Sequence, residues 1–157
     1  MKIEVQNLSK KFNDTTVVDN ISFLAEKNKT LGLLGPNGCG KTTSIGMMLG
    51  LIKPSSGNVF VDGRNLDQIE KYTFLSKINF ASPYIELPKK LTVKENLEIY
   101  ARLYGVKKFD NRITEISEDL NLEKFLKKKT GELSSGQKNR VSLAKSLINK
   151  PSVLFLD

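Results

Sequence analysis

The residues that most constrain this chain are 35–42, which read Gly-Pro-Asn-Gly-Cys-Gly-Lys-Thr. In such a G-x-x-x-x-G-K-T loop, the glycines let consecutive backbone N–H groups turn inward around a phosphate chain. A helix that begins near Gly40 directs the positive end of its dipole at the same anion. Lys41 supplies a charge for the β- and γ-phosphates, and the Thr42 hydroxyl suits a Mg²⁺ ligand. The loop therefore predicts a binding site for a nucleoside triphosphate and Mg²⁺.

The segments on both sides of the loop have the order that such a site requires. Residues 30–34 are a short apolar run of strand length, and residues 42–51 are a run of helix length with its apolar residues on roughly one face. We predict a strand, the loop and a helix, in that order. The candidate phosphate-binding residues are Gly35, Pro36, Asn37, Gly38, Cys39, Gly40, Lys41, Thr42 and Thr43.

A second pattern lies near the other end of the chain, where Leu-Ser-Ser-Gly-Gln at 133–137 precedes a run with helical spacing at 141–148. Either Ser134 or Ser135 suits the N-cap of that helix. Serine hydroxyls and unpaired N–H groups at one helix start would make a second anion site. The same residues also suit a plain cap and turn, because Ser and Gly favour helix starts for local reasons.

The last five residues, 153–157, are an apolar strand that ends in the carboxylate of Asp157. A P-loop enzyme uses a carboxylate at this place to hold the water shell of Mg²⁺ from the far side. The predicted metal ligands are therefore Thr42 and Asp157.

These three segments, in this order, closely resemble the nucleotide-binding domain of ATP-binding cassette (ABC) transporters. Residues 35–42 look like the Walker A motif of that family, and residues 153–157 look like Walker B. Residues 133–137 look like its LSGGQ signature, with Ser135 in place of the first glycine. The resemblance implies an α/β fold: a P-loop NTPase with a RecA-like core, an N-terminal antiparallel β subdomain and an α-helical signature subdomain, incomplete at the C-terminus.

The resemblance extends to residues 3–12, which are similar to the opening strand of the family, and to residues 91–97, which look like part of its helical subdomain. It implies that residues 1–157 form a single ATP-binding domain. The expected subdivision is a core with β subdomain at about 1–82 and 150–157, and a helical subdomain with the signature at about 83–149.

The function that the resemblance implies is that of the ATP-binding subunit of an ABC transporter. Such a subunit couples ATP binding and hydrolysis to transport of a substrate, which this sequence does not name. Lys41 and Asp157 would be the catalytic residues. The loop of one copy would face the signature of a second copy in a head-to-tail dimer, and a transmembrane permease would be the other partner. The signature residues expected at ATP are Ser134, Ser135, Gly136 and Gln137.

Phe12 occupies the place of the aromatic residue that stacks on adenine in the family. Stacking on a base tolerates sequence variation because every base has a π-face. Phe12 is therefore predicted to be an ATP contact. The alternative is ordinary packing in the core, which requires no special partner.

Two features depart from the family pattern. Pro83 falls where the Q-loop glutamine is expected. Proline has no side-chain amide that could contact Mg²⁺ or the attacking water. The hydroxyl of the neighbouring Ser82 is the candidate substitute. The sequence stops at Asp157, where the family continues with a catalytic glutamate, a D-loop and a switch histidine, and it contains no histidine at all. The family strand that lies between the Walker A and Walker B strands also falls after this point.

Two interpretations of activity follow. In the first, the intact protein is an ATPase, and these residues hold most of its ATP site. In the second, these residues bind nucleotide without turnover, because loss of the general base alone costs about 10²- to 10⁴-fold in rate.

Composition agrees with one globular domain, since 39% of the residues are hydrophobic. No apolar run approaches the roughly 20 residues that a bilayer requires, so membrane association would be indirect. The single cysteine, Cys39, cannot form an internal disulfide, and its place beside the predicted phosphate site suits a reduced cytosolic compartment. We expect its thiol to act as a small space-filling residue of the loop. We expect a cytoplasmic protein that is peripheral on the inner face of the cell membrane through its permease.

A net charge of +8 makes nucleic acid a partner to consider. The lysine clusters are short, scattered and not interleaved with aromatic residues, so solvated surfaces explain them more simply. We expect no nucleic-acid partner, and an ABC-type ATPase acting on nucleic acid or the ribosome is the alternative.

Local signals predict the remaining elements. Residues 1–34 read as antiparallel strands with a hairpin turn at 13–15. A break at 54–57 precedes a strand at 58–61, and the pattern from 91 to 126 is helical.

Overall fold

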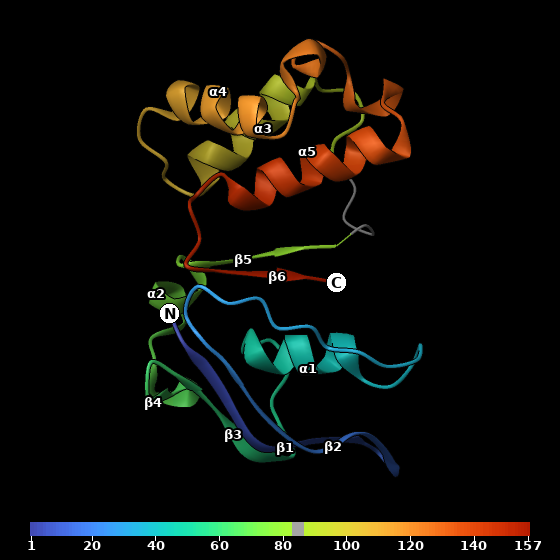
Figure 1. Ribbon diagram of the computed structural model, residues 1–157, viewed down its shortest axis with the longest axis vertical. Coiled ribbons are helices and arrows are strands. Elements are labelled where there is room, and N and C mark those ends of the chain that lie inside the picture. Colours follow the sequence, from blue (N-terminus) through green and yellow to red (C-terminus); the bar gives the residue numbers. More distant parts are fainter. Residues whose placement is uncertain (83–86) are drawn as a thin grey trace. The chain divides into compact units, whose positions relative to one another are not determined.

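The computed structural model describes residues 1–82 and 87–157 (Figure 1). The chain forms two compact units, Met1–Leu75 and Ser76–Asp157, and each unit has its own sheet.

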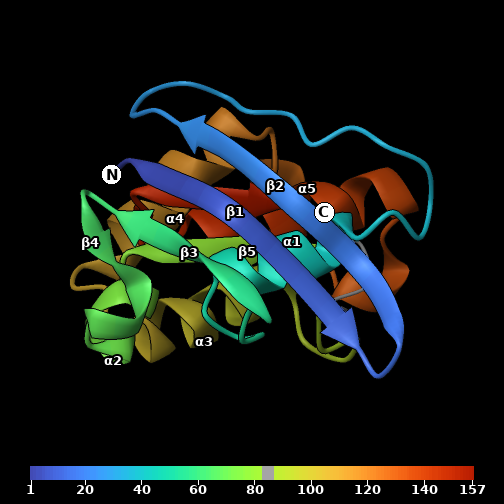
Figure 2. The ribbon, with the colours of Figure 1, turned by 90° about the horizontal axis from the view of Figure 1, so that it is seen from below.

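The first unit is built on an antiparallel sheet in the order β2-β1-β3-β4 (Figure 2). Its strands are β1 (Ile3–Phe12), β2 (Thr15–Ala25), β3 (Ser56–Val61) and β4 (Arg64–Asn65). Helix α1 (Lys41–Met48) lies against β1 and β2, and α2 (Lys71–Leu75) follows a 3₁₀ turn at Leu66–Gln68. The buried apolar residues of this unit include Ile3, Val5, Leu8, Val18, Ile45, Met47, Met48, Val59 and Val61.

The predicted hairpin is confirmed. β1 and β2 are joined by a turn at Asn13 and Asp14, and Phe12 pairs with Thr15 across it. Asn13 has a φ of 49°, a left-handed conformation that asparagine tolerates better than most residues.

β1 keeps its apolar side chains on one face despite their irregular spacing. Ile3 and Val5 follow the two-residue period of a strand, but the next buried residue is Leu8, three positions on. The register shifts between Val5 and Leu8, where Asn7 has a φ of 48°. This bulge inserts the extra residue that returns Leu8 to the buried face.

Helix α1 follows the glycine loop as predicted but is shorter than the predicted 42–51. It begins at Lys41 and ends at Met48. Gly50 has a φ of 66°, and the next two backbone N–H groups donate to the carbonyl of Gly46. A left-handed glycine after a helix lets the chain reverse and satisfy the last carbonyls, so the end of the apolar run leaves the helix.

The strand predicted at 30–34 is not formed, so that prediction is wrong. Leu31 is 45% exposed and Leu34 is 96% exposed, and no strand of the described residues is hydrogen-bonded along the segment. An extended segment becomes a strand only where a neighbour takes its backbone hydrogen bonds. The apolar pattern is therefore that of a strand, but no described strand pairs with this segment.

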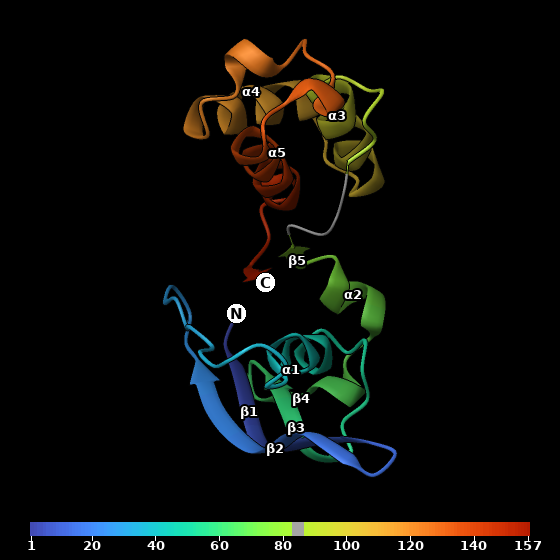
Figure 3. The same cartoon turned by 90° about the vertical axis from the view of Figure 1, so that its right-hand side faces the viewer.

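The described residues of the second unit include three α-helices that share one apolar core (Figure 3). They are α3 (Val93–Leu103), α4 (Phe109–Asp119) and α5 (Ser135–Leu147), with 3₁₀ turns at Glu123–Phe125 and Thr130–Glu132. The predicted helical pattern is confirmed, with a break near Gly105, whose φ is 65°. The buried core residues are Val93, Leu97, Ala101, Ile113, Ile116, Leu122, Leu133, Val141, Ala144 and Ile148.

Helix α3 begins with a capping box. The Thr92 hydroxyl accepts the N–H of Glu95 at 3.2 Å, and the Glu95 carboxylate accepts the N–H of Thr92 at 2.7 Å. The hydrogen bonds from Thr92 hold the pKa of Glu95 below its usual value.

In the described parts of the chain, no helix is both long and apolar enough to cross a bilayer.

Two parallel strands, β5 (Ile78–Ala81) and β6 (Val153–Leu156), complete the second unit. A parallel pair needs a long crossover, which the helices supply. β5 contacts α5, and both strands fall within the second compact unit. The expected boundaries, which assign residues up to 82 and residues 150–157 to the core, stay a prediction.

Candidate functional site

The glycine loop ends at an open helix N-terminus. Gly38 and Gly40 have φ values of 83° and 90°, which glycine adopts without steric cost. Gly40 is the N-cap of α1, and no described side chain caps this helix. The first N–H groups of a helix have no partner within it, so an anion can accept their hydrogen bonds. This geometry fits the phosphate site predicted for residues 35–43.

The side chain of Lys41 folds back over the loop. Its Nζ donates to the carbonyl oxygens of Gly35 and Pro36, at 2.8 Å each, and lies 3.8 Å from Cys39 Sγ. These contacts hold the ammonium beside the backbone that is predicted to surround the phosphates. An ammonium has three donors, and a charged phosphate oxygen is a stronger acceptor than a neutral carbonyl. A phosphate can therefore compete for one of these donors.

The remaining loop residues lie around this helix start. Asn37 and Cys39 are exposed, Thr42 is exposed in the first turn of α1, and Thr43 is half-buried. Oxygen ligands suit Mg²⁺, so the Thr42 hydroxyl remains the predicted metal contact of the first unit.

Phe12 is the last residue of β1, and its side chain is 46% exposed. The ammonium of Lys10 lies 4.8 Å from the ring centroid and also donates to the carbonyl of Lys53 at 2.8 Å. The alternative of ordinary core packing does not describe this exposed ring. Its stacking on adenine stays a prediction.

Replacing Phe12 with Ala is expected to weaken ATP binding about tenfold, because base stacking on an aromatic ring contributes roughly 1–3 kcal/mol. Titration with a fluorescent ATP analogue measures the effect. Phe12→Leu is the matched control: it keeps apolar bulk but lacks a π-face, so it should bind almost as weakly as Phe12→Ala. Unchanged affinity in both variants would remove Phe12 from the site.

The signature segment forms the start of α5, with Ser134 rather than Ser135 as the N-cap. The Ser134 hydroxyl accepts the N–H of Gln137 at 3.4 Å, and the Gln137 side-chain oxygen accepts the N–H of Ser134 at 2.9 Å. In this capping box Ser134 uses its hydroxyl oxygen as an acceptor, so its O–H donor can serve an incoming anion. Ser135 and Gly136 are exposed in the first turn. The cap and the anion-site interpretations are therefore compatible.

Ser82 and Asp157 follow directly after neighbouring parallel strands. Ala81 pairs with Leu156, and the N–H of Asp157 donates to the carbonyl of Ala81 at 3.1 Å. Residues that follow paired parallel strands meet at one edge of the sheet, where α/β proteins bind ligands. Ser82 is buried and Asp157 is exposed. The predicted substitution for the Q-loop glutamine thus has its serine at the same edge as the predicted metal ligand, while Pro83 lies outside the described residues.

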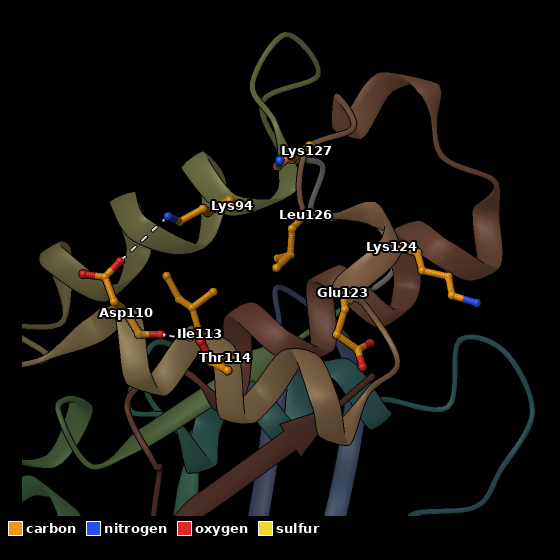
Figure 4. A pocket seen from close by; sticks show the side chains of 8 residues that line it. All are labelled: Lys94, Asp110, Ile113, Thr114, Glu123, Lys124, Leu126 and Lys127. Carbon is orange, nitrogen blue, oxygen red and sulfur yellow. Dashed lines mark hydrogen bonds and ion pairs between the residues drawn. The ribbon is translucent and has the colours of Figure 1, made fainter.

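A cavity of about 400 Å³ opens between α3, α4 and the turn at Glu123–Phe125 (Figure 4). None of the predicted ATP-site residues lines it. Its lining residues are Lys94, Asp110, Ile113, Thr114, Glu123, Lys124, Leu126 and Lys127. The ammonium of Lys94 is 3.9 Å from Asp110 and 3.4 Å from Glu98, so part of its charge is already paired.

Cys39 offers a direct test of the loop geometry. Its thiol is exposed and lies beside Lys41. An alkylating group on this sulfur would occupy space that the phosphates need, so ATP is expected to slow alkylation of Cys39 severalfold. Mass spectrometry of the labelled peptide measures the rate with and without ATP. Lys41→Ala, which should not bind ATP, is the control, and equal labelling of the wild type with and without ATP would contradict the geometry.

Sequence reasoning missed the capping box of α5, although Ser-x-x-Gln at 134–137 is the recognised pattern for one. It also missed Thr130 and Asn96, two buried polar residues whose side chains both donate to the carbonyl of Pro88. No side-chain pattern marks them, because their partners are backbone carbonyl groups, which every residue carries.

The family model for ABC transporters matches residues 18–157. The Nod factor export ATP-binding protein I of Burkholderia thailandensis is 36% identical over 157 residues, and the zinc import ATP-binding protein ZnuC of Rickettsia prowazekii is 40% identical over 157 residues. Each alignment covers 99% of this chain, but only 51% and 61% of those proteins, respectively. The chain thus spans between about half and three fifths of the length of these relatives.

Solved structures agree with this assignment. A structure from Pyrococcus furiosus, described as an ABC transporter ATP-binding protein, matches with a TM-score of 0.86 and 34% identity, over 100% of this chain and 75% of that one. The cbiO1 structure from Clostridium perfringens, part of the ABC transporter complex cbiONQ, matches with a TM-score of 0.87 and 27% identity, over 99% of this chain and 64% of that one. These matches confirm the predicted P-loop NTPase fold with its antiparallel β subdomain. The chain belongs to the ABC transporter family, as an ATP-binding domain of it.

Proposed function

We propose that the protein containing these residues is an ABC-type ATPase, the ATP-binding subunit of a transporter, which converts ATP and water to ADP and phosphate. The observation that carries the proposal is the open N-terminus of α1. Two left-handed glycines precede it, and Lys41 is held over the loop by two carbonyl groups. This combination of N–H donors and a positive charge suits a triphosphate.

The roles of the residues follow from their chemistry. The N–H groups of 35–43 would orient the phosphates, and Lys41 would offset negative charge that develops on the γ-phosphate. Mg²⁺, when bound, would supply positive charge that offsets the negative charge of the phosphates. Thr42 and Asp157 would hold it with oxygen ligands, and Ser82 lies at the sheet edge next to Asp157, where it would take the place of the Q-loop glutamine.

The dimer and the permease are part of this proposal. The exposed Ser134, Ser135, Gly136 and half-buried Gln137 at the start of α5 would face the triphosphate bound to a second copy. Membrane association would come through the permease, with the domain on the cytoplasmic face. Similar relatives include one named for export and one named for import, so identity at this level determines neither the direction nor the cargo.

The proposal is tested by measuring Mg·ATP binding and phosphate release side by side. The proteins are the 157-residue polypeptide, the full-length protein, and the Lys41→Ala variant of each. We expect Lys41-dependent binding in both lengths and turnover only in the full-length protein. Lys29→Ala is the matched control, because Lys29 is an exposed lysine of the same unit that pairs with Glu26. Absence of binding in every protein would overturn the proposal.

Two other outcomes identify the alternatives. Lys41-dependent binding without turnover in either length would indicate a nucleotide-binding module that does not hydrolyse ATP. Turnover that requires added RNA or ribosomes would indicate an ATPase acting on nucleic acid.

A further inference from the structure

We propose that Thr130 and Asn96 are positioning residues for the signature at 134–137. Thr130 fastens the segment 88–92 to the turn that leads into α5, and Asn96 fastens the same segment to α3. The inference rests on the proposed function, in which the exposed Ser134 meets a phosphate bound to a second copy.

Two buried side chains converge on this segment. The Thr130 hydroxyl donates to the carbonyl of Pro88 at 2.6 Å and is 3.4 Å from that of Leu91. The side-chain nitrogen of Asn96 donates to the same Pro88 carbonyl at 3.2 Å and to the carbonyl of Thr92 at 3.0 Å. Thr130 is 3% exposed and Asn96 is 1% exposed. One turn carbonyl is therefore held by donors from two different elements.

The backbone makes the same connection. The contacts are Thr130 N to Leu91 O at 2.9 Å, Gly131 N to Lys89 O at 3.0 Å, and an antiparallel bridge between Thr92 and Lys129. The segment ahead of α3 and the segment ahead of α5 are thus joined by antiparallel backbone hydrogen bonds, although they lie far apart in the sequence.

The route from this contact to the signature is short. Thr130–Glu132 form a 3₁₀ turn, Leu133 is buried in the helical core, and Ser134 is the exposed N-cap of α5. The position of Ser134 is therefore determined by two buried residues that precede it in the chain, Thr130 and Leu133. A 3₁₀ turn of three residues has little length in which to absorb a displacement of Thr130.

Asn96 holds the turn at 88–92 at a cost in stability. Its Oδ1 is buried and has no hydrogen-bond partner among the described residues. A buried acceptor without a partner destabilises a fold, and an apolar residue at this position of α3 would avoid that penalty. The amide instead places its donors on the turn at 88–92. This points to the position of the turn, rather than to stability alone, as the use of the side chain.

The expected consequence is catalytic. A misplacement of about 1 Å at a site of phosphoryl transfer can cost about 10²-fold in rate. Losing the Thr130 contact should lower kcat, because the signature acts when it meets the bound triphosphate. Nucleotide affinity should hold, because the loop at 35–43 belongs to the first unit and takes no part in this contact.

The test uses the full-length protein. Thr130→Val keeps the shape of the side chain and removes the donor, whereas Thr130→Ser keeps the donor. Gly131→Ala perturbs the same contact sterically, because the added Cβ would lie 3.0 Å from the carbonyl oxygen of Lys89. Thr114→Val is the matched control: it removes an exposed hydroxyl that donates to the carbonyl of Asp110 within α4.

We expect Thr130→Val and Gly131→Ala to lower kcat about tenfold, with the dissociation constant for ATP changed by less than about twofold. Thr130→Ser should recover most of the rate, and Thr114→Val should behave as wild type. Wild-type kcat in both Thr130→Val and Gly131→Ala would overturn the inference. So would a loss of ATP binding with unchanged turnover per bound site, since that pattern indicates only a loss of folded protein.

A second measurement separates this inference from the proposed function. Hydrogen exchange of the amides at 133–137 requires no turnover, and it should be faster in Thr130→Val but not in Thr114→Val. Unchanged exchange in Thr130→Val would overturn the positioning role even if the protein is an ATPase. Faster exchange in a protein without Lys41-dependent turnover would support the structural fastening and reject the proposed function instead.

Discussion

Replacing Gly40 with Ala is expected to abolish measurable ATP binding and to lower the free energy of unfolding of the first unit by about 3 kcal/mol. Gly40 has a φ of 90°, and a Cβ there would lie 2.4 Å from the carbonyl oxygen of Val17 and 2.8 Å from a methyl carbon of Val18. Both valines belong to β2, which is paired with β1 and cannot move away cheaply. The start of α1 would have to shift, and with it the N–H groups that face the phosphates.

Two other glycines separate the causes of this effect. Gly38 has a φ of 83°, but a Cβ there would meet no atom within 4 Å, so Gly38→Ala introduces strain without a clash and should cost about 1 kcal/mol. Gly32 has neither feature, and Gly32→Ala should be nearly neutral. Urea unfolding and titration with a fluorescent ATP analogue measure both quantities. If Gly38→Ala and Gly40→Ala had equal effects, the contact with β2 would be irrelevant.

Replacing Arg112 with Ala is expected to lower the free energy of unfolding of the second unit by about 2–3 kcal/mol. The guanidinium donates to the carbonyls of Leu147 at 2.6 Å and Ile148 at 3.3 Å, and it pairs with Glu115 at 2.9 Å. The last carbonyls of a helix lack intrahelical partners and carry the negative end of its dipole. The side chain of Arg112 is only 13% exposed, so water would replace these hydrogen bonds poorly.

Arg112→Lys is the matched control for this prediction. It keeps the charge but lacks the planar fork that reaches two carbonyls and a carboxylate together, so it should recover less than half of the loss. Thermal or urea unfolding measures the series. Wild-type stability of Arg112→Ala would show that solvent replaces the cap.

The same contact predicts how stability changes with pH. The hydrogen bond from Arg112, followed by its charge and by Lys150, holds the pKa of Glu115 below its usual value. A carboxylate whose pKa is lowered by folding stabilises the native state above its unfolded pKa, and this contribution is lost as the pH falls through the folded pKa. Arg112→Ala should therefore lose less stability than wild type on acidification through that range.

Much of the candidate site could be predicted from local sequence. The loop at 35–42 combines glycines, Lys41 and Thr42 in an order that has one strong chemical use, and the structure places it at an uncapped helix start. The hairpin at 13–15 and the start of α5 were equally local, because turn residues and N-caps act within a few positions. The choice between Ser134 and Ser135 as the cap required the tertiary structure.

The errors occurred where a partner from elsewhere in the chain decides the outcome. The apolar run at 30–34 predicts a strand, but strand formation depends on a neighbour that accepts its hydrogen bonds. Thr130 and Asn96 gave no signal, because their acceptors at 88–92 are carbonyl groups that any residue carries.

The sequence by itself determined the chemistry of this protein: which segment can hold a triphosphate, which helix start can present hydroxyl and N–H donors, and which carboxylate follows a strand. These properties reside in side-chain types and in backbone preferences over fewer than ten or so neighbouring residues. Only the tertiary structure decided which extended segments are paired, where Ser82 and Asp157 meet at a sheet edge, and how Thr130 holds the approach to Ser134. Those features depend on hydrogen bonds between residues far apart in the chain, and backbone donors and acceptors are the same for almost every amino acid.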